Sequence, residues 1–277
     1  MRVWVSSSIA NFKEKILKKT GLQEWTWDTR NEDTLFVGMY HWGDWKRFRA
    51  TKGKRTIIWC GSDILHVKNN SRTPWFLKLL PWRRLIGFHK AKNICENIVE
   101  QKALKEMGID AEIRYIFWGD VNKYPVSYKH SDRPQVWMTA HPGREKEYGV
   151  DLIVEIAKKI PEVIFHVYGV SKPFLEDYPW GRSWDNEMVI FHGIVSEEKL
   201  DEEIKGYQGS VRLNEFDGFA EVLAKSILLG QYPISRIPYP FIQQCKNEEE
   251  LIQQLKNLST YKQPNYKSRE YLLKNIS

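Results

Sequence analysis

A short segment near the end of the chain combines carboxylates with glycine in a pattern that could bind a polar ligand. Glu215 and Asp217 precede Gly218, and apolar residues at helical spacing follow as far as Leu229. Carboxylates accept hydrogen bonds from ligand hydroxyl groups, and the free N–H groups at a helix start attract anions. The segment therefore predicts a strand, an acidic turn and a helix opened by Gly218, together binding an anionic ligand rich in hydroxyl groups. The alternative is that Asp217 only caps the helix.

A second group, with charge suited to phosphate, lies earlier in the chain. Arg144 and Lys146 stand between a predicted strand and a predicted helix, within the sequence REKE. Guanidinium and ammonium groups near a helix start can bind the oxygens of a diphosphate. The alternative is an ordinary solvated loop.

Polar residues also follow predicted strands in the first half of the chain. His41 lies in the sequence GMYHWGDW, Asp63 lies in WCGSDIL, and Ser6–Ser8 follow the first strand. Ligands of parallel sheets bind at the carboxyl ends of strands, so we expect His41 or Asp63 to orient a reacting group there. The alternatives are a core histidine, a capping aspartate and capping serines.

The elements that must position these residues alternate between short β-rich runs and helical patterns, which predicts an α/β fold with parallel sheets. The predicted strands are Arg2–Ser6, Thr34–Met39, Arg55–Cys60, Lys92–Glu96, Glu112–Phe117, Gln135–Thr139, Val163–Tyr168, Met188–His192, Gly209–Leu213 and Tyr232–Ser235. The predicted helices are Asn11–Lys19, Pro74–Ile86, Val99–Met107, Gly149–Lys159, Glu197–Tyr207, Phe219–Leu229, Glu248–Leu258 and Tyr266–Ile276.

A polar stretch without periodicity divides the chain into two halves. It predicts a linker at residues 121–134, between an N-terminal domain at 1–120 and a C-terminal domain at 135–262. Residues 263–277 predict a helix that can pack back on the N-terminal domain. Two α/β halves of this kind predict a ligand site in a cleft between them.

Composition and charge narrow the class of protein. The 277 residues, 42% hydrophobic and 28% charged, are typical of a globular protein. Residues 1–124 carry 23 Lys and Arg against 13 Asp and Glu, a balance of +10, whereas residues 125–277 carry 19 against 22, a balance of −3. The basic half therefore predicts an anionic partner, which could be a membrane surface, a nucleic acid or an acidic glycan.

The cysteines and the apolar segments bear on metal sites and on location. Cys60, Cys95 and Cys245 lie far apart without histidines at metal-ligand spacing, so we expect no zinc site, no disulfide framework and a cytoplasmic protein. The sequence MRVWVSSS is predicted to be a strand, not a secretion signal. No window approaches the roughly 20 apolar residues that a membrane-spanning helix needs.

Two basic runs could meet the anionic partner. Pro74–Lys92 interleaves aromatic and apolar residues with Lys and Arg. Such a segment can lie on an anionic membrane or bind a nucleic acid, and the alternative is a core-facing helix with solvated basic residues. The run Lys46–Arg55 is predicted to be a solvated loop.

The segment Val211–Ser235 resembles the signature of family 4 glycosyltransferases, which are retaining enzymes of the GT-B fold. That motif reads acidic-Gly-Phe-Gly, four residues, Glu, and then a helix ending in Gly before a Pro-Val/Ile strand. Asp217–Ala220 match its opening, and Gly230–Ile234 contain its close. There are two departures, because Asp217 replaces a glutamate and Lys225 stands where the second glutamate would bind the nucleotide ribose.

The resemblance covers most of residues 111–242. Val136–Tyr168 is similar to the part that clamps the donor diphosphate, with Arg144 at the arginine position, Tyr148 at the lysine position and Lys146 as a substitute. Val189–Val195 resembles the turn that contacts the nucleobase. The donor-binding residues implied by the resemblance are Arg144, Lys146, Tyr168, Gly169, Val195, Glu215, Asp217, Gly218, Phe219, Ala220 and Lys225.

The resemblance implies two Rossmann-like domains that face each other across a cleft, the N-terminal one on the acceptor side. It implies retaining transfer of a sugar from a nucleotide-sugar donor to a glycan or lipid acceptor, with no metal and no cofactor. The acceptor can then lie at an anionic membrane surface. Asp63 and His41 are then the catalytic candidates. A DNA-modifying glucosyltransferase and a nucleotide-sugar-binding protein without catalysis stay open as alternatives. An NAD-dependent enzyme is disfavoured, because no GxGxxG follows the first strand.

Overall fold

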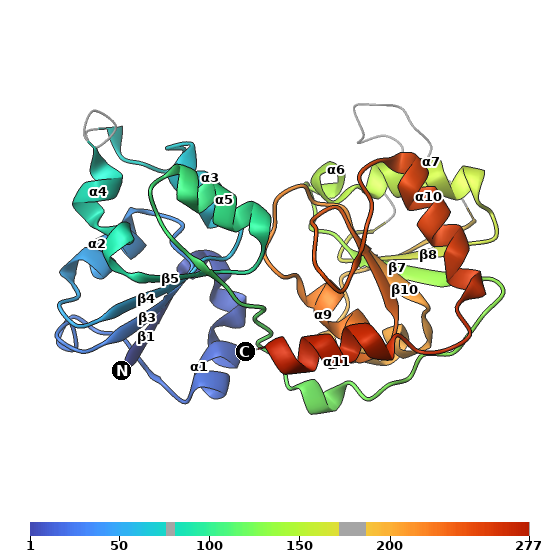
Figure 1. Ribbon diagram of the computed structural model, residues 1–277, viewed down its shortest axis with the longest axis horizontal. Coiled ribbons are helices and arrows are strands. Elements are labelled where there is room, and N and C mark those ends of the chain that lie inside the picture. The colour runs from blue at the N-terminus through green and yellow to red at the C-terminus, as the bar shows by residue number, and fades with distance from the viewer. Residues whose placement is uncertain (76–80, 172–186, 277) are drawn as a thin grey trace. The chain divides into compact units, whose positions relative to one another are not determined.

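The computed structural model describes residues 1–75, 81–171 and 187–276. Contacts within the chain divide it into two compact units. Figure 1 colours the chain by residue number, from blue at the N-terminus to red at the C-terminus. The first unit contains Met1–Asp120, Phe216–Phe219 and Asn275–Ser277, and the second contains Val121–Glu215 and Ala220–Lys274. Each unit is an α/β structure with one parallel six-stranded sheet.

The sheet of the first unit has the strand order β2-β1-β3-β4-β5-β6. Its strands are β1 (Arg2–Val5), β2 (Gln23–Glu24), β3 (Thr34–Val37), β4 (Arg55–Ile58), β5 (Lys92–Cys95) and β6 (Glu112–Ile113). Its α-helices are α1 (Lys13–Thr20), α2 (Trp42–Ala50), α3 (Ser62–Lys68), α4 (Trp82–Ile86) and α5 (Ile98–Glu106). Its 3-10 turns are η1 (Ser7–Phe12) and η3 (Phe88–Lys90).

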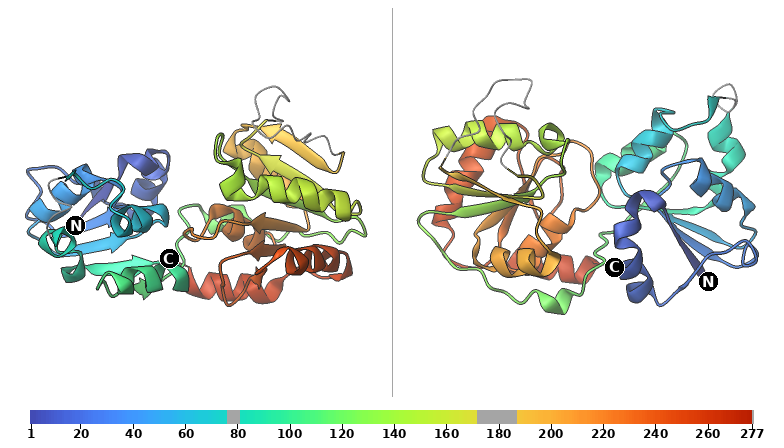
Figure 2. Two further views of the ribbon diagram at one scale, coloured as in Figure 1. Left: turned by 90° about the horizontal axis from the view of Figure 1, so that it is seen from above. Right: turned by 180° about the vertical axis from the view of Figure 1, so that it is seen from behind.

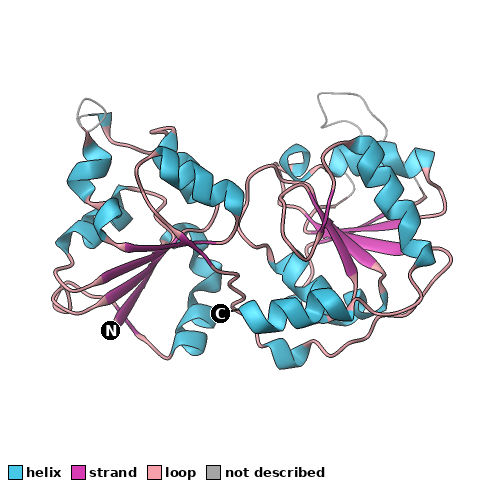
Figure 3. Cartoon of the chain, in the orientation of Figure 1, coloured by secondary structure: helices cyan, strands magenta, loops and turns pink. Residues whose placement is uncertain are grey.

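Helices cover both faces of this sheet, as Figure 3 shows. Side chains alternate along each strand, so neighbouring residues enter different cores. Leu35 and Val37 pack with Ile16 of α1, whereas Phe36 packs on the opposite side with Trp45 of α2. Burial on both faces explains why β3 is apolar at nearly every position.

Two helices of the first unit are absent from the sequence-based prediction. Helix α2 includes Lys46–Ala50, so the prediction of a solvated loop at Lys46–Arg55 is wrong for that part. Helix α3 follows β4 after a turn at Gly61. Both helices are short and contain few apolar residues, and their helical form depends on side chains such as Trp45 and Ile64 that are buried against the sheet.

The sheet of the second unit has the strand order β12-β11-β10-β7-β8-β9. Its strands are β7 (Gln135–Thr139), β8 (Ile164–Tyr168), β9 (Val189–Gly193), β10 (Gly209–Arg212), β11 (Tyr232–Ser235) and β12 (Gln243–Gln244). Its α-helices are α6 (Glu145–Tyr148), α7 (Val150–Lys159), α8 (Glu197–Glu203), α9 (Glu221–Leu228), α10 (Glu248–Asn257) and α11 (Tyr266–Asn275). Its 3-10 turns are η4 (Val121–Lys123), η5 (Ile204–Gly206) and η6 (Leu258–Thr260).

Helices α7 and α10 lie on one side of this second sheet and α9 and α11 on the other, and Figure 2 gives two further views of these layers. The first pair shares one apolar core with the strands, in which Ile153 and Leu251 are buried. Helix α9 is buried at every position from Val222 to Leu228.

Residues 263–277 were predicted to form a helix that can pack back on the N-terminal domain, and helix α11 forms there. Two of its side-chain hydrogen bonds lie within the second unit, and packing on the N-terminal domain stays a prediction. Ser268 Oγ donates to the carbonyl of Phe241, and Arg269 Nε donates to the carbonyl of Leu228. Ile276, just beyond the helix, pairs with Tyr115, and both residues belong to the first unit.

The basic, aromatic segment Pro74–Lys92 is described only in part. Residues 76–80 of the predicted helix Pro74–Ile86 lie outside the described residues, and its last part forms α4. Trp82 and Ile86 of α4 are buried, as the core-facing alternative predicts. Among the helices of residues 1–75, 81–171 and 187–276, none has the length and apolar character to span a membrane.

Candidate functional site

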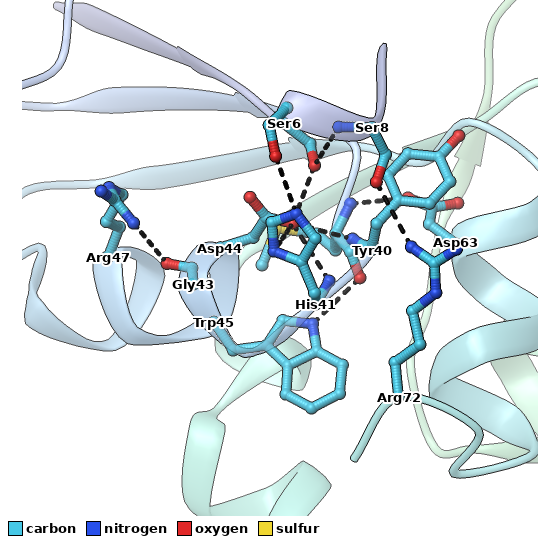
Figure 4. Close-up of polar contacts among 12 residues, drawn as sticks. Ser6, Ser8, Tyr40, His41, Gly43, Asp44, Trp45, Arg47, Asp63 and Arg72 are labelled. Carbon is cyan, nitrogen blue, oxygen red and sulfur yellow. Dashed lines mark hydrogen bonds and ion pairs between the residues drawn. The ribbon is translucent and has the colours of Figure 1, made fainter. Parts of the chain in front are cut away.

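The loops that follow β1, β3, β4 and β5 gather the candidate residues of the first unit. Because all these strands are parallel, their carboxyl ends meet at one edge of the sheet. Figure 4 shows Ser6, His41, Asp44 and Asp63 together at this edge. The sequence placed these residues after separate strands, and the parallel topology brings them to one site.

Asp44 is the hub of this edge, and its side chain is completely buried. Its carboxylate accepts hydrogen bonds from Trp4 Nε1 at 2.9 Å and from Ser6 Oγ at 2.9 Å. It also accepts from the backbone N–H groups of Tyr40 at 3.0 Å and His41 at 3.1 Å. One carboxylate thus fixes the loop after β3 against β1.

His41 is held at both ring nitrogens. Its Nε2 lies 2.9 Å from Ser7 Oγ, and its Nδ1 lies 3.2 Å from Asp44 Oδ2. The side chain occupies the N-cap position of α2 and is 33% exposed, so it is not a core histidine. A hydroxyl, an imidazole and a carboxylate in this order can hold or move a proton at Nε2, the nitrogen next to the exposed serine.

Asp63 has a different role at the same edge. It is completely buried, and its oxygens accept backbone N–H groups of Met39 at 2.8 Å, Cys60 at 3.0 Å and Ile64 at 2.9 Å. Burial raises the pKa of Asp63 to about 7, against the opposing effect of those three N–H donors. The structure shows a carboxylate that shapes the loops after β3 and β4, and direct contact with a substrate stays a prediction.

Residues Phe216–Phe219 of the predicted acidic turn belong to the first unit, and they do not start the helix that follows. Phe219 N donates to Glu96 Oε2 at 2.9 Å, and Ala220 is the N-cap of α9, which begins at Glu221. The prediction that Gly218 opens the helix is therefore wrong, because the backbone bond to Glu96 keeps Phe219 outside it. The capping alternative for Asp217 is wrong too, because Ala220 occupies the N-cap position. The Oδ1 of Asp217 accepts from Gly218 N at 3.0 Å.

Glu215, the other carboxylate of the predicted turn, lies in the second unit. Its side chain is 85% exposed, and Oε1 lies 3.2 Å from Arg236 Nη1. A surface pair of this kind holds the carboxylate only weakly. Glu215 is thus open to solvent, whereas Asp217 is half-buried.

The predicted phosphate-binding residues lie at the carboxyl end of β7. Arg144 precedes the short helix α6, which replaces the predicted loop and contains Lys146. Arg144 Nε donates to Glu147 Oε2 at 2.8 Å, and both side chains are about half exposed. The guanidinium also lies over the ring of Tyr148, 5.7 Å from its centroid.

Sequence reasoning missed a second arginine at this edge. Arg212, the last residue of β10, places its guanidinium 4.5 Å from the centroid of Tyr148, the same ring that Arg144 approaches. Strands β7 and β10 are parallel neighbours, so their carboxyl ends lie side by side. A basic residue at the end of a predicted strand was the available signal, but the strand was predicted to continue to Leu213.

Lys225, which replaces an acidic residue of the family motif, is engaged with the protein itself. Its Nζ lies 2.8 Å from Asp201 Oδ1 and 3.1 Å from Glu197 Oε1, and its side chain is 3% exposed. Burial lowers the pKa of Lys225, but the pairing with these carboxylates outweighs that effect and raises it. A contact between Lys225 and a donor stays a prediction.

The remaining predicted donor contacts lie on β8 and after β9. Tyr168 is buried, with its hydroxyl 2.8 Å from both Glu203 Oε2 and Tyr207 Oη, so its side chain points into the protein. Gly169 follows it with φ of 89°, and a Cβ there would lie 2.2 Å from the carbonyl oxygen of Ala140. Val195 is half-buried in the loop between β9 and α8.

A histidine pair beside Tyr168 is a further feature that the sequence did not reveal. His166 Nδ1 lies 2.9 Å from His192 Nε2, and His166 Nε2 lies 2.9 Å from Gln135 Oε1. Burial lowers the pKa of His166 to about 4, and the neighbouring His192 adds to this effect. The pair therefore stays neutral near pH 7.

The described residues also bear on metal binding. Among them, no set of three or more His, Cys, Asp or Glu side chains is arranged to hold a metal ion.

No protein-family model and no curated protein sequence matches the chain. Solved structures do resemble it. A TarM mutant from S. aureus in complex with fondaparinux, alpha-GlcNAc-glycerol and UDP has a TM-score of 0.59 at 10% identity, over 88% of this chain and 52% of that chain. The pneumococcal O-GlcNAc transferase GtfA in complex with UDP and GlcNAc has a TM-score of 0.58 at 13% identity, over 96% and 56%.

The lipopolysaccharide outer core galactosyltransferase WaaB has a TM-score of 0.61 at 13% identity, over 98% of this chain and 78% of that chain. The chain spans about half the length of the TarM and GtfA chains that it matches. At these identities the likeness concerns the fold, which was predicted from the alternating strands and helices. The protein has the α/β fold of GT-B glycosyltransferases, with a parallel sheet in each of its two units.

Proposed function

We propose that this protein is a glycosyltransferase that moves a sugar from a nucleotide-sugar donor to an acceptor hydroxyl group. The observation that carries the proposal is the pair of guanidinium groups of Arg144 and Arg212 on the ring of Tyr148. They lie where parallel strands end, which is where ligands of such sheets bind. Two arginines there match the charge and the oxygen geometry of a diphosphate.

The surroundings of Arg144 suit a group that changes partner when a ligand arrives. Its ion pair with Glu147 is formed between side chains that are 47% and 58% exposed. An exposed pair of this kind contributes little free energy, about 0–1 kcal/mol. Exchanging Glu147 for a phosphate oxygen therefore costs little.

The chemistry follows from where charge develops. Breaking the bond between sugar and phosphate leaves negative charge on the diphosphate, which Arg144 and Arg212 would stabilise. These arginines supply positive charge of the kind that a metal ion supplies in other transferases, so we propose metal-independent transfer. His41, fixed by Asp44, would hold the acceptor hydroxyl at Nε2. The resemblance to family 4 supports retention of the anomeric configuration.

The names of the structural neighbours guide the choice of substrates. TarM and GtfA are both described with UDP, so a UDP-sugar is the first donor to test. The basic balance of residues 1–124 favours an anionic acceptor, and we propose an acidic glycan or a lipid, with the protein peripheral at an anionic membrane surface.

The same charge motivates a second candidate, a DNA-modifying glucosyltransferase. Binding to duplex DNA that falls steeply as salt rises would favour it. Absence of DNA binding at low salt would remove it.

A thermal-shift panel with UDP, GDP, TDP, ADP, CMP and their common sugar conjugates tests the proposal. A nucleotide that binds the folded protein raises the melting temperature by mass action. Arg144→Ala and Arg212→Ala are each expected to weaken nucleotide binding roughly tenfold. Lys158→Ala is the control, because it removes an equally exposed cation of α7 whose partner is Glu155.

Three results separate the candidates. Binding followed by hydrolysis or transfer of the sugar supports a transferase. Binding without either reaction indicates a nucleotide-sugar-binding protein. No shift with any nucleotide contradicts the proposal.

A further inference from the structure

The acidic turn Phe216–Phe219 is anchored in the first unit, although the chain on both sides of it belongs to the second. Phe216 packs against the core formed with α2, α3 and α5. The ring of Phe219 lies 5.4 Å from that of Tyr115, and only 5% of this residue is exposed. Two aromatic side chains therefore fix the ends of the turn and leave Asp217 and Gly218 between them.

The backbone of the turn is bound by two residues at the carboxyl end of β5. Asn97 Nδ2 donates to the carbonyl of Asp217 at 2.8 Å, and Glu96 Oε2 accepts from Phe219 N at 2.9 Å. Glu96 and Asn97 are both buried, with 8% and 2% exposure. These bonds are therefore protected from water and define where the turn lies.

Two glycines permit this close contact. A Cβ on Gly218 would lie 2.2 Å from Glu96 Oε2, and a Cβ on Gly61 would lie 2.7 Å from Gly218 N. Both distances are far below van der Waals contact, so a side chain at either place would move the turn or the Glu96 carboxylate that binds it. Gly61 also has φ of 81°, which other residues rarely adopt.

Glu96, which binds the turn, is itself held by a residue of α5. Glu100, completely buried on α5, accepts from Glu96 N at 2.6 Å through Oε2. Burial raises the pKa of Glu96 and of Glu100. The charge of Asp217 adds to the effect at Glu96, and the charge of Glu96 adds to it at Glu100. Apolar residues in place of Glu96 and Glu100 would be buried at a lower cost in free energy. The buried Glu96 carboxylate accepts the Phe219 N–H, which an apolar residue at this position could not do.

We infer that Glu96 and Asn97 are positioning residues that set the place of the Asp217–Phe219 turn, and through it the contact with the donor sugar. The functional part of this inference rests on the proposed transferase activity. Neither residue needs to touch the substrate. The turn carries the Asp217 carboxylate and the Gly218 backbone, which would meet the sugar hydroxyls.

Asn97→Asp separates this role from the fold. Asn97 Oδ1 caps α5 by accepting from Val99 N and Glu100 N, both at 3.0 Å, and an aspartate caps equally well. The change replaces the Nδ2 donor, so that an oxygen faces the Asp217 carbonyl, and it also adds a negative charge. Asn247→Asp is the matched control, because Asn247 caps α10 by accepting from Glu250 N.

Gly218→Ala tests the same contact from the side of the turn and introduces no charge. Its Cβ would collide with Glu96 Oε2. If positioning is the role of Glu96 and Asn97, both variants should give the same change, and Asn247→Asp should give none.

The first measurement needs no ligand. Hydrogen exchange of the Phe219 amide should be roughly tenfold faster in Asn97→Asp and in Gly218→Ala, because its bond to Glu96 is weakened. Unchanged exchange in both variants would overturn the anchoring of the turn, whatever the protein binds.

The second measurement compares dissociation constants for a nucleoside diphosphate and for its sugar conjugate. Both variants should weaken binding of the conjugate roughly tenfold and leave binding of the diphosphate unchanged, because the diphosphate lacks the sugar that the turn would contact. Equal weakening of both ligands, or of neither, would overturn the positioning role. Failure of wild-type protein to bind any nucleotide would instead contradict the proposed function, and the exchange result would still decide the anchoring.

Discussion

The carboxyl edges of the two sheets are built in opposite ways. In the first unit, completely buried carboxylates of Asp44 and Asp63 accept backbone N–H groups and fix the loops. In the second unit, the arginines approach an aromatic ring at the surface, and Arg144 pairs with an exposed glutamate. The loops of the first edge are therefore held in place without a ligand, whereas the side chains of the second edge can change partners when a ligand binds.

This difference suits two tasks. A group that acts on a reacting hydroxyl must be held in place, and His41 is fixed through Asp44. A clamp for a flexible diphosphate gains from side chains whose existing partners are weak. Substitutions in each unit test whether the two edges differ in this way.

The largest effect is expected at the hub of the first edge. Asp44→Ala would leave the donors of Trp4 and Ser6 and two backbone N–H groups without their acceptor. We expect a loss of about 4 kcal/mol in the free energy of unfolding of the first unit. Urea unfolding measures it, with Asp132→Ala at a 93% exposed site as the control. A loss below about 1 kcal/mol would show that the loops hold without this carboxylate.

A large effect is also expected where the second unit does bury a charge. Lys225→Glu restores the acidic residue of the family motif, but it would set a third carboxylate beside Glu197 and Asp201. We expect the variant to lose about 3 kcal/mol of unfolding free energy and to gain no nucleotide affinity. Unfolding and nucleotide titration of one preparation check both points. A tighter-binding, equally stable variant would mean that Lys225 only blocks a ribose site.

Asp63→Asn should have a smaller effect. One oxygen still accepts backbone N–H groups, while the new amide N–H₂ faces a donor instead of accepting from it. We expect a loss of about 2 kcal/mol and a displaced loop after β3, seen as faster exchange of the Met39 amide. Slow exchange at Met39 in this variant would contradict the role of Asp63 in shaping that loop.

The smallest effect, when it is measured over one pH unit, is the pH dependence of the stability of each unit. The pKa of Asp63 is raised from 3.8 to about 7, so between these values the unfolded chain releases a proton that the folded unit retains. The stability of the first unit should therefore fall as pH rises, by at most about 1.4 kcal/mol per pH unit from this group. Glu96 and Glu100 shift in the same direction.

His166 gives the second unit the opposite slope. Its pKa is lowered from 6.5 to about 4, so on acidification across this range the unfolded chain takes up a proton before the folded unit does. The stability of the second unit should fall as pH falls. Hydrogen exchange measured separately for each unit tests both slopes, with Asp63→Asn and His166→Asn expected to flatten them. Parallel slopes in the two units would contradict the comparison.

Much of the fold followed from local patterns. The predicted strands Gln135–Thr139 and Tyr232–Ser235 agree with β7 and β11, since parallel strands buried on both faces are short apolar runs that the sequence shows directly. Placing His41 and Arg144 after strands was enough to put them at carboxyl edges. The first turn of α9 was misplaced, because Phe219 bonds to Glu96, which lies far earlier in the sequence.

The alternation of strands and helices, and the polar residues that follow strands, could be read from the amino-acid sequence alone. The contacts of those residues could be identified from the three-dimensional structure but not from the sequence. The structure placed Arg212 on Tyr148, buried Lys225 between carboxylates and joined Asn97 to Asp217 across 120 positions of sequence. The reason is physical: periodicity records which face of an element is buried, whereas a hydrogen bond or ion pair between distant residues depends on how the sheet orders its strands.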